Sequence, residues 1–133
     1  MKRRKINLLI VVMMIGMLIP AISFCQEEIE IQVSPSILNL QSNGVVVTIH
    51  TDIPFSQVSA QTVSMNGLEI DSWKSDNQGF FVAKFDMDEV KELEGLEIGE
   101  YNTLTLNGLK VSGDTFTGSE DVLVINNIPK GKK

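Results

Sequence analysis

The chain has 133 residues, a formal charge of −6 and one cysteine, and its charges are divided unevenly along it. Positions 2–5 hold four of the 11 lysines and arginines, so seven remain beyond Cys25 against all 17 acidic residues, a formal charge of −10. A domain this acidic repels phosphate backbones, which excludes nucleic acid as a partner. Cys25 is the only thiol, which excludes a disulfide and a His/Cys metal site from the residues that follow it.

The chain opens with a cationic start and an apolar run from Ile6 to Ile22. Together with the small-residue exit around Ser23, this order predicts a signal-peptide helix within residues 1–25 and export to the periplasm, the cell surface or the medium. Three fates stay open: ordinary cleavage, a lipoprotein signal with a lipid on Cys25, or retention as an uncleaved anchor. The membrane is then a partner only through this leader or through a lipid on Cys25.

After the leader we expect one β-sandwich domain over residues 26–126 and a flexible basic tail over residues 127–133. Apolar and polar residues alternate over residues 29–33, which is the pattern of a half-buried strand. Residues 44–51 are the most strand-like stretch. Their alternation places Val45, Val47 and Ile49 on the core face, and Pro54 ends the strand because proline cannot donate to a ladder.

Residues 62–71 read as a strand, a tight turn at Asn66–Gly67 and a return strand. We expect Trp73 to anchor the core from that return strand. A polar turn over residues 75–79 precedes a strand over residues 80–85. The one short helix is predicted near residues 86–93, where Asp86 can cap its N-terminus.

Alternation returns over residues 101–111, a turn follows at residues 112–114, and residues 122–125 form the last strand. Residues 103–112 repeat the residue classes of residues 62–71, including the Asn-Gly pair. We interpret both stretches as hairpins with the same turn chemistry. Short strands separated by frequent turns predict an all-β fold, an antiparallel β-sandwich with one short helix.

The same residues resemble an immunoglobulin-like β-sandwich that serves as an accessory domain in exported bacterial and archaeal surface proteins. The likeness rests on residues 33–44 (VSPSILNLQSNG), on residues 63–67 (VSMNG), on the helix entry at residues 84–86 (KFD) and on residues 116–119 (FTGS). The family's usual Asp-Gly turn stands here as Gly113–Asp114. The resemblance implies an interaction or structural role and names no partner.

Catalytic chemistry has few candidate residues in this sequence. His50 is the only histidine, and no nucleophile elbow or phosphate-cradling glycine loop occurs. We therefore expect no enzyme activity and no cofactor. Calcium is the alternative ligand, because Asp114, Glu120 and Asp121 flank a glycine-containing loop and hard cations take oxygen ligands from such loops.

We expect an exported, non-enzymatic adhesion, scaffold or interaction module whose partner is a cell-surface protein or a glycan. The alternative is a carbohydrate-binding or calcium-binding module. A sugar site predicts Trp73 or Tyr101 exposed on a flat face, and a calcium site predicts carboxylates that converge on one point. An enzyme predicts a cleft that brings together His50 or two carboxylates.

Overall fold

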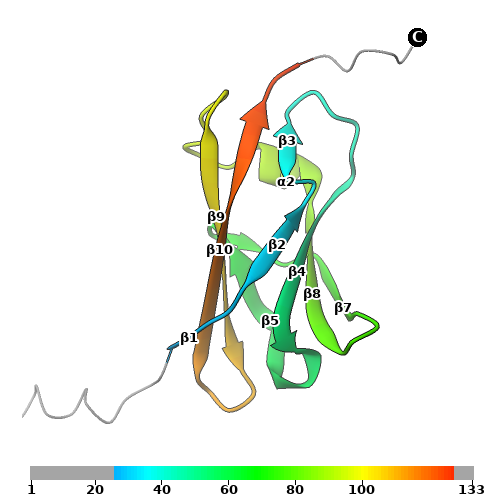
Figure 1. The fold of residues 1–133 in the computed structure, drawn as a ribbon, viewed down its shortest axis with the longest axis vertical. Coiled ribbons are helices and arrows are strands. Elements are labelled where there is room, and N and C mark those ends of the chain that lie inside the picture. Colours follow the sequence, from blue (N-terminus) through cyan, green and yellow to red (C-terminus); the bar gives the residue numbers. More distant parts are fainter. Residues whose placement is uncertain (1–25, 128–133) are drawn as a thin grey trace, which may run out of the picture.

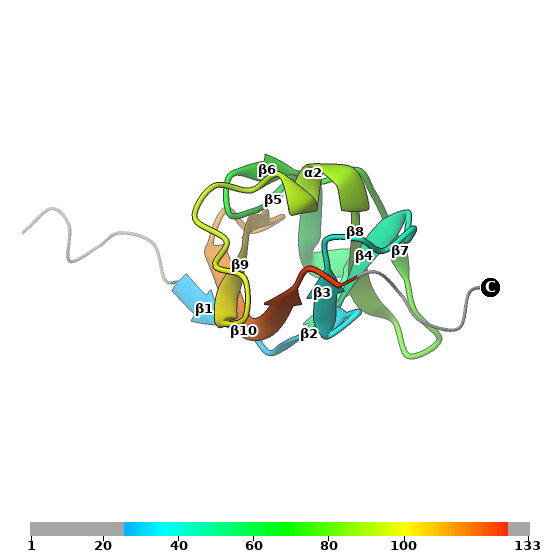
Figure 2. The same cartoon turned by 90° about the horizontal axis from the view of Figure 1, so that it is seen from above.

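The computed structural model describes residues 26–127, which form two β-sheets packed face to face (Figures 1 and 2). Sheet A has the strand order β1–β10–β9–β5–β6, with β3 also paired to β10, and sheet B has the order β2–β4–β8–β7. The strands are β1 (Gln26–Glu28), β2 (Ile31–Ser34), β3 (Ile37–Asn39), β4 (Val46–Pro54), β5 (Val58–Met65), β6 (Leu68–Glu69), β7 (Ser72–Ser75), β8 (Phe80–Asp86), β9 (Tyr101–Lys110) and β10 (Thr115–Ile125). The predicted all-β sandwich is confirmed. The predicted signal helix, Cys25 and all but the first residue of the predicted tail lie outside the described residues.

The core lies between the sheets and is built from alternate residues of their strands. Val47 and Ile49 of β4 are buried as predicted, while Val45 is 81% exposed because β4 begins one residue after it. The largest fully buried side chains are Phe81, Phe85, Phe116, Ile49, Ile53, Met65, Met87, Leu104 and Leu106. Apolar burial is the main stabilising contribution in such a domain.

The N-terminal segment changes sheets twice. β1 pairs with β10 in parallel, β2 pairs with β4 in the antiparallel sense, and β3 returns to pair with β10 in parallel. β1 is a strand that the sequence pattern did not predict. The two parallel pairings also depart from the expected antiparallel sandwich, because β1 and β3 both run in the same direction as β10.

The crossing from β1 to β2 depends on close contact with β10. The Ile29 N–H donates to the Thr117 carbonyl at 2.8 Å, and the Val33 N–H donates to Glu120 Oε1 at 2.9 Å. Gly118 lies between these two contacts. A Cβ atom at Gly118 would stand 2.8 Å from the backbone oxygen of Ile29 and 2.7 Å from a methyl group of Ile31. The absent side chain is therefore what lets the crossing segment lie against β10.

Of the Asn-Gly pairs in residues 62–71 and 103–112, only the first forms a turn. Asn66 and Gly67 have φ values of 49° and 85° and join β5 to β6, as predicted. The interpretation of Asn107–Gly108 as a second such turn is wrong, because both residues lie inside β9 and the turn comes later, with Gly113 at φ 96°. Gly108 instead faces Phe116 across the strand pair, and a Cβ there would stand 2.6 Å from the Phe116 ring.

Trp73 does not anchor the core. It pairs with Ala83 and so lies on the core side of sheet B, but β7 is an edge strand and the side chain is 39% exposed. At the edge of a sheet the opposing layer covers a large ring only on one flank. The prediction was wrong about the strand, because the return strand β6 ends at Glu69 and Trp73 lies in β7 of the other sheet, and it was also wrong about the depth.

The predicted helix is confirmed as α2 (Met87–Lys91), and a short 3-10 turn, η2 (Phe55–Gln57), follows β4. Asp86 caps α2 by accepting a 2.8 Å hydrogen bond from the Asp88 N–H. Met87 and Val90 point into the core, and the Lys91 ammonium donates to the Ser42 carbonyl at 2.6 Å. α2 thus closes one end of the sandwich (Figure 2).

The hairpin between β7 and β8 is organised by the carboxylate of Asp76. Its Oδ1 accepts the N–H groups of Gln78 at 2.8 Å and Phe80 at 2.9 Å. The hydrogen bond from Phe80 lowers the pKa of Asp76 below its ordinary value; slight desolvation opposes this, and the amides of Gln78 and Gly79 and the charge of His50 add to the lowering. The ionised form is therefore the one that holds the turn.

Replacement of Gly118 by alanine tests the close approach at the crossing. We expect Gly118→Ala to lower the free energy of unfolding by about 1–3 kcal/mol, since the new methyl group meets a backbone oxygen that cannot rotate away. Urea denaturation measures this. Ser72→Ala, at an exposed position of β7, is the control and should change stability by no more than about 0.5 kcal/mol. Equal stability of the two variants would contradict the crossing geometry.

Asp76 should make stability depend on pH in the acid range. Its pKa is lower in the folded state, so its contribution is present above the unfolded pKa of about 3.9 and is lost as pH falls through the folded pKa. Asp76→Asn keeps an oxygen acceptor and does not titrate. In thermal melts followed by circular dichroism, we expect this variant's deficit in Tm to shrink between pH 6 and about pH 2. A deficit that stays constant over that range would contradict the assignment.

Candidate functional site

The outer face of sheet A, which is turned away from the core, carries two kinds of side chain. Over most of β9 and β10 they are short and polar. Thr103 Oγ1 donates to Asp121 Oδ1 at 2.6 Å, and the hydroxyls of Thr105 and Ser119 lie 2.8 Å apart. We call these two directly opposed pairs the polar ladder. Their mutual hydrogen bonds hold these short side chains to one another across the two strands.

At the α2 end of the same face the side chains become apolar. Leu123 of β10 lies directly opposite Ile37 of β3 on one side and Tyr101 of β9 on the other. Directly opposite residues share a face, so the three side chains form a row across three strands. Ile37 is 50% exposed, Leu123 is half-buried and Tyr101 is 71% exposed. We call Ile37, Leu123 and Tyr101 the apolar row.

The row is held by rigid backbone on both sides. Leu123 N–H donates to the Ser36 carbonyl at 3.3 Å, and Leu40 N–H donates to the Ile125 carbonyl at 2.9 Å, which together fasten β3 to β10. Beyond β9, Asn66 accepts the Thr105 N–H at 2.8 Å and donates to the Thr103 carbonyl at 3.2 Å. The Asn66 side chain therefore fastens the β5–β6 turn to the edge of β9 next to the polar ladder.

The loop that leads into Tyr101 is fixed by Asn102. Asn102 Oδ1 accepts the Glu97 N–H at 2.8 Å, and its Nδ2 donates to the carbonyls of Glu97 and Glu100, each at 3.0 Å. The Gly99 N–H also donates to the Val124 carbonyl at 2.7 Å. These bonds hold the loop beside the apolar row, with Ile98 57% exposed at its tip.

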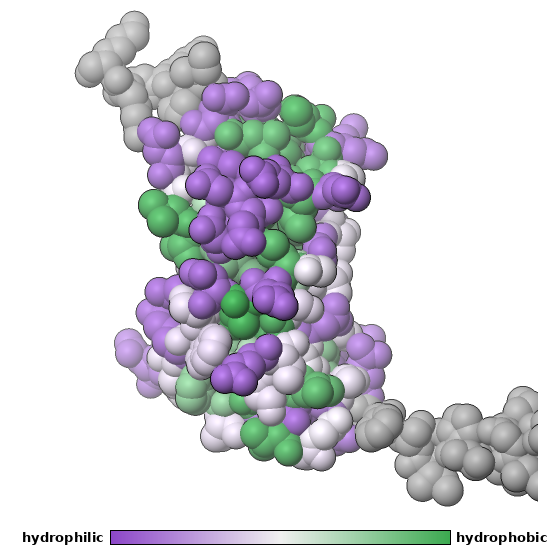
Figure 3. Space-filling view, turned by 180° about the vertical axis from the view of Figure 1, so that it is seen from behind, coloured by the Kyte–Doolittle hydropathy of each residue, from purple (hydrophilic) through white to green (hydrophobic). Residues whose placement is uncertain are grey.

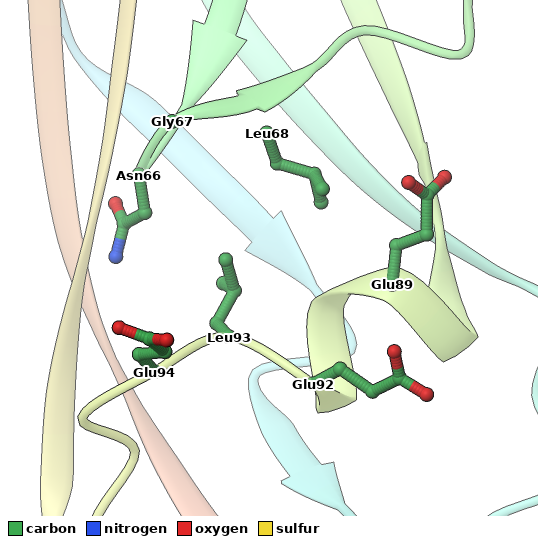
Figure 4. Close-up of a pocket in the computed structure, with 7 residues that line it drawn as sticks. All are labelled: Asn66, Gly67, Leu68, Glu89, Glu92, Leu93 and Glu94. Carbon is green, nitrogen blue, oxygen red and sulfur yellow. The ribbon is translucent and has the colours of Figure 1, made fainter.

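A separate hollow of about 410 Å³ lies between the Asn66 turn and α2. Leu68 and Leu93 point into it, whereas the carboxylates of Glu89, Glu92 and Glu94 on its rim point in different directions (Figure 4). In the view from behind, hydrophilic residues gather over the upper half of the molecule, and hydrophobic residues surround them (Figure 3). The hollow is a shallow apolar floor with an acidic rim.

The three residues predicted for calcium do not converge. Glu120 and Asp121 are successive residues of β10 and so lie on opposite faces of sheet A. Glu120 accepts the Val33 N–H, Asp121 accepts the Thr103 hydroxyl, and Asp114 lies at the far end of β10 in the turn from β9. Among residues 26–127 no group of three or more His, Cys, Asp or Glu side chains is arranged to hold a metal ion.

The other predicted residues lie apart from the apolar row. His50 is exposed on the outer face of β4, opposite Gln32 and Val82 and beside a small hollow that Glu30 and Asp52 also line. Trp73 lies on the far edge of sheet B. Tyr101 alone meets the expectation of an exposed aromatic ring on a flat face. Cys25, the candidate for lipidation, lies outside the described residues.

The sequence pattern missed two members of the apolar row. Ile37 and Leu123 read as ordinary apolar strand residues, and their exposure follows only from the register of β3 on β10. Alternation could show only that Ile37 and Leu38, or Leu123 and Val124, point to opposite faces; it could not show which residue of each pair is buried.

Comparisons with protein-family models, with curated proteins and with solved structures found no match to this chain. In the described part of the chain, no helix has the length and hydropathy needed to span a bilayer.

Calcium should leave the stability of the protein unchanged. The three candidate carboxylates face different ways, so they offer no shared site that would bind the ion only in the folded state. Thermal melts with and without about 5 mM calcium, above the 10⁻⁴–10⁻³ M range of extracellular calcium modules, should coincide. Magnesium at the same concentration is the control. A rise of Tm with calcium alone would contradict this prediction.

Proposed function

We propose that this chain is an exported, non-enzymatic interaction module that binds another cell-surface component through the outer face of sheet A. The observation that carries this proposal is the apolar row beside the polar ladder. An apolar centre that contains an aromatic residue, next to polar groups and held on rigid strands, has the composition of a protein-binding surface. Tyr101 supplies the exposed aromatic ring, and Ile37 and Leu123 extend the apolar area.

The strand order supports the kinship with immunoglobulin-like domains. In those domains strands A, B, E and D form one sheet and strands C, F and G form the other. If β2, β4, β5, β7, β8, β9 and β10 are named A to G in chain order, sheet B has the order A–B–E–D and sheet A contains G–F–C. Domains of this architecture occur widely at cell surfaces.

Export is proposed from the leader sequence, in which a basic start precedes an apolar run. Since residues 26–127 contain no cysteine, the exported domain would depend on its packed core alone for stability. A lipid on Cys25 or an uncleaved leader would hold the same domain at a membrane, and cleavage would release it.

A carbohydrate-binding module is the second candidate, and one observation favours it. Tyr101 is 71% exposed on a flat face, next to the hydrogen-bonding groups of Thr103 and Asp121. A ring of this kind can stack on a sugar while neighbouring polar groups bind its hydroxyls. The neighbours across the strands are aliphatic, however, and Trp73 lies on the other sheet, so a second aromatic platform does not extend this site.

Capture from envelope extracts tests the role of this face. Protein purified after expression of the full chain is immobilised, and we expect the double variant Ile37→Ser/Tyr101→Ser to lose a component that the wild type retains. Trp73→Ser, on the other sheet, is the control and should retain it. Protease treatment of the extract should abolish capture if the component is a protein, and periodate oxidation should abolish it if it is a glycan.

Capture that is equal for the wild type and the double variant would contradict the proposed face. Circular dichroism melts establish that the double variant is folded, and we expect it to be, because both side chains are at least half exposed.

A further inference from the structure

We infer that the partner of the apolar row is a basic polypeptide segment, in which lysine or arginine residues flank apolar side chains. This inference rests on the proposed function and names the chemistry of the partner. It follows from the charge around the row, from the rigidity of the charged loop and from the aliphatic character of the row itself.

The chain segment that leads into Tyr101 is strongly acidic. The segment from Asp86 to Glu100 holds seven carboxylates and a single lysine. That lysine, Lys91, is engaged with the Ser42 carbonyl at 2.6 Å. Glu100 directly precedes Tyr101, Glu97 lies in the same loop, and both are exposed; Asp121 lies on the ladder side of the row. A partner that covers the row therefore lies between the acidic loop and the ladder residue Asp121.

The carboxylates at the loop stand on preorganised backbone. Asn102 bonds to the main chain of Glu97 and Glu100, and the Gly99 and Val124 amides tie the loop to β10. Because the backbone that carries these carboxylates is already fixed, only the side chains have to be ordered when a partner binds, so less entropy is lost on association than with a mobile loop. The loop is thus suited to attract and orient a cationic partner.

Two other possible partners fit the row less well than a basic segment does. A second copy of this chain would bring its own excess of acidic residues against these carboxylates, and like charges opposed at an interface disfavour association. A glycan is less favoured because two of the three side chains in the row, Ile37 and Leu123, are aliphatic. A segment with both cationic and apolar side chains complements the carboxylates and the row together.

The test uses a short synthetic peptide with several lysines around a central pair of phenylalanines, titrated into the isotope-labelled protein. We expect amide shifts at β3, at Tyr101 and around Leu123, and an affinity that falls as salt is raised. Two control peptides carry glutamate in place of lysine, or serine in place of phenylalanine. Either control binding as well as the first peptide would overturn the inference.

Variants separate local charge from net charge. Ile37→Ser/Tyr101→Ser should weaken binding by about tenfold, the loss expected for a central anchor. Glu97→Gln/Glu100→Gln should weaken it by about two- to fivefold. Glu69→Gln/Asp71→Asn removes the same charge from β6 and its exit and should have no effect. If this control weakens binding as much as the loop variant, attraction is only to the net charge and the inference is overturned.

The basic tail of the chain itself is the last alternative partner for the apolar row. If replacement of Lys130, Lys132 and Lys133 by glutamine shifts the amide signals of the row in the absence of peptide, the tail occupies the row and the inference is overturned. If the peptide does not bind but capture from extracts still depends on the row, the partner chemistry is wrong while the interaction role stands. If both fail, the proposed function fails as well.

Discussion

The contact between the N-terminal segment and β10 is the constraint on which the rest of the structure depends. Gly118 leaves room for Ile29 and Ile31 to lie against β10, and the Glu120 carboxylate accepts the Val33 N–H where no strand partner is present. A buried donor without a partner costs about 1–3 kcal/mol, so this bond matters although it involves one side chain. The same contact directs β3 back onto sheet A.

The return of β3 links the fold to the proposed site. β3 places Ile37 beside Leu123, and Leu123 already lies opposite Tyr101, so the three-strand apolar row exists only because β3, which is distant in sequence, joins the β9–β10 pair in this register. Without β3, the outer face of sheet A would end in an unpaired edge at β10 over this stretch, and edges of that kind invite non-specific strand pairing. The segment that closes the sandwich therefore also completes the surface that we propose binds the partner.

Local chemistry allowed the sequence to predict those elements that are decided within a few residues. The alternation around Val47, the cap at Asp86 and the turn at Asn66 were all predicted correctly, because each depends on neighbours in the chain. Asn107–Gly108 has the same turn chemistry and failed, because Phe116 opposite Gly108 needs the space that a glycine leaves in a strand. The depth of Trp73 and the exposure of Ile37 depend on strand order and register, which sequence alternation does not contain.

Hydrogen exchange at the Val33 amide tests most directly the claim that the crossing segment is an integral part of the sandwich. This amide donates to Glu120 rather than to a neighbouring strand. We expect it to exchange as slowly as the amides of the core strands β4 and β8, because only global unfolding would expose it to solvent. Exchange at Val33 that is much faster than in β4 and independent of global stability would show a segment that opens by itself. That result would contradict both the close contact of the crossing segment with β10 and the fixed position of β3 in the proposed site.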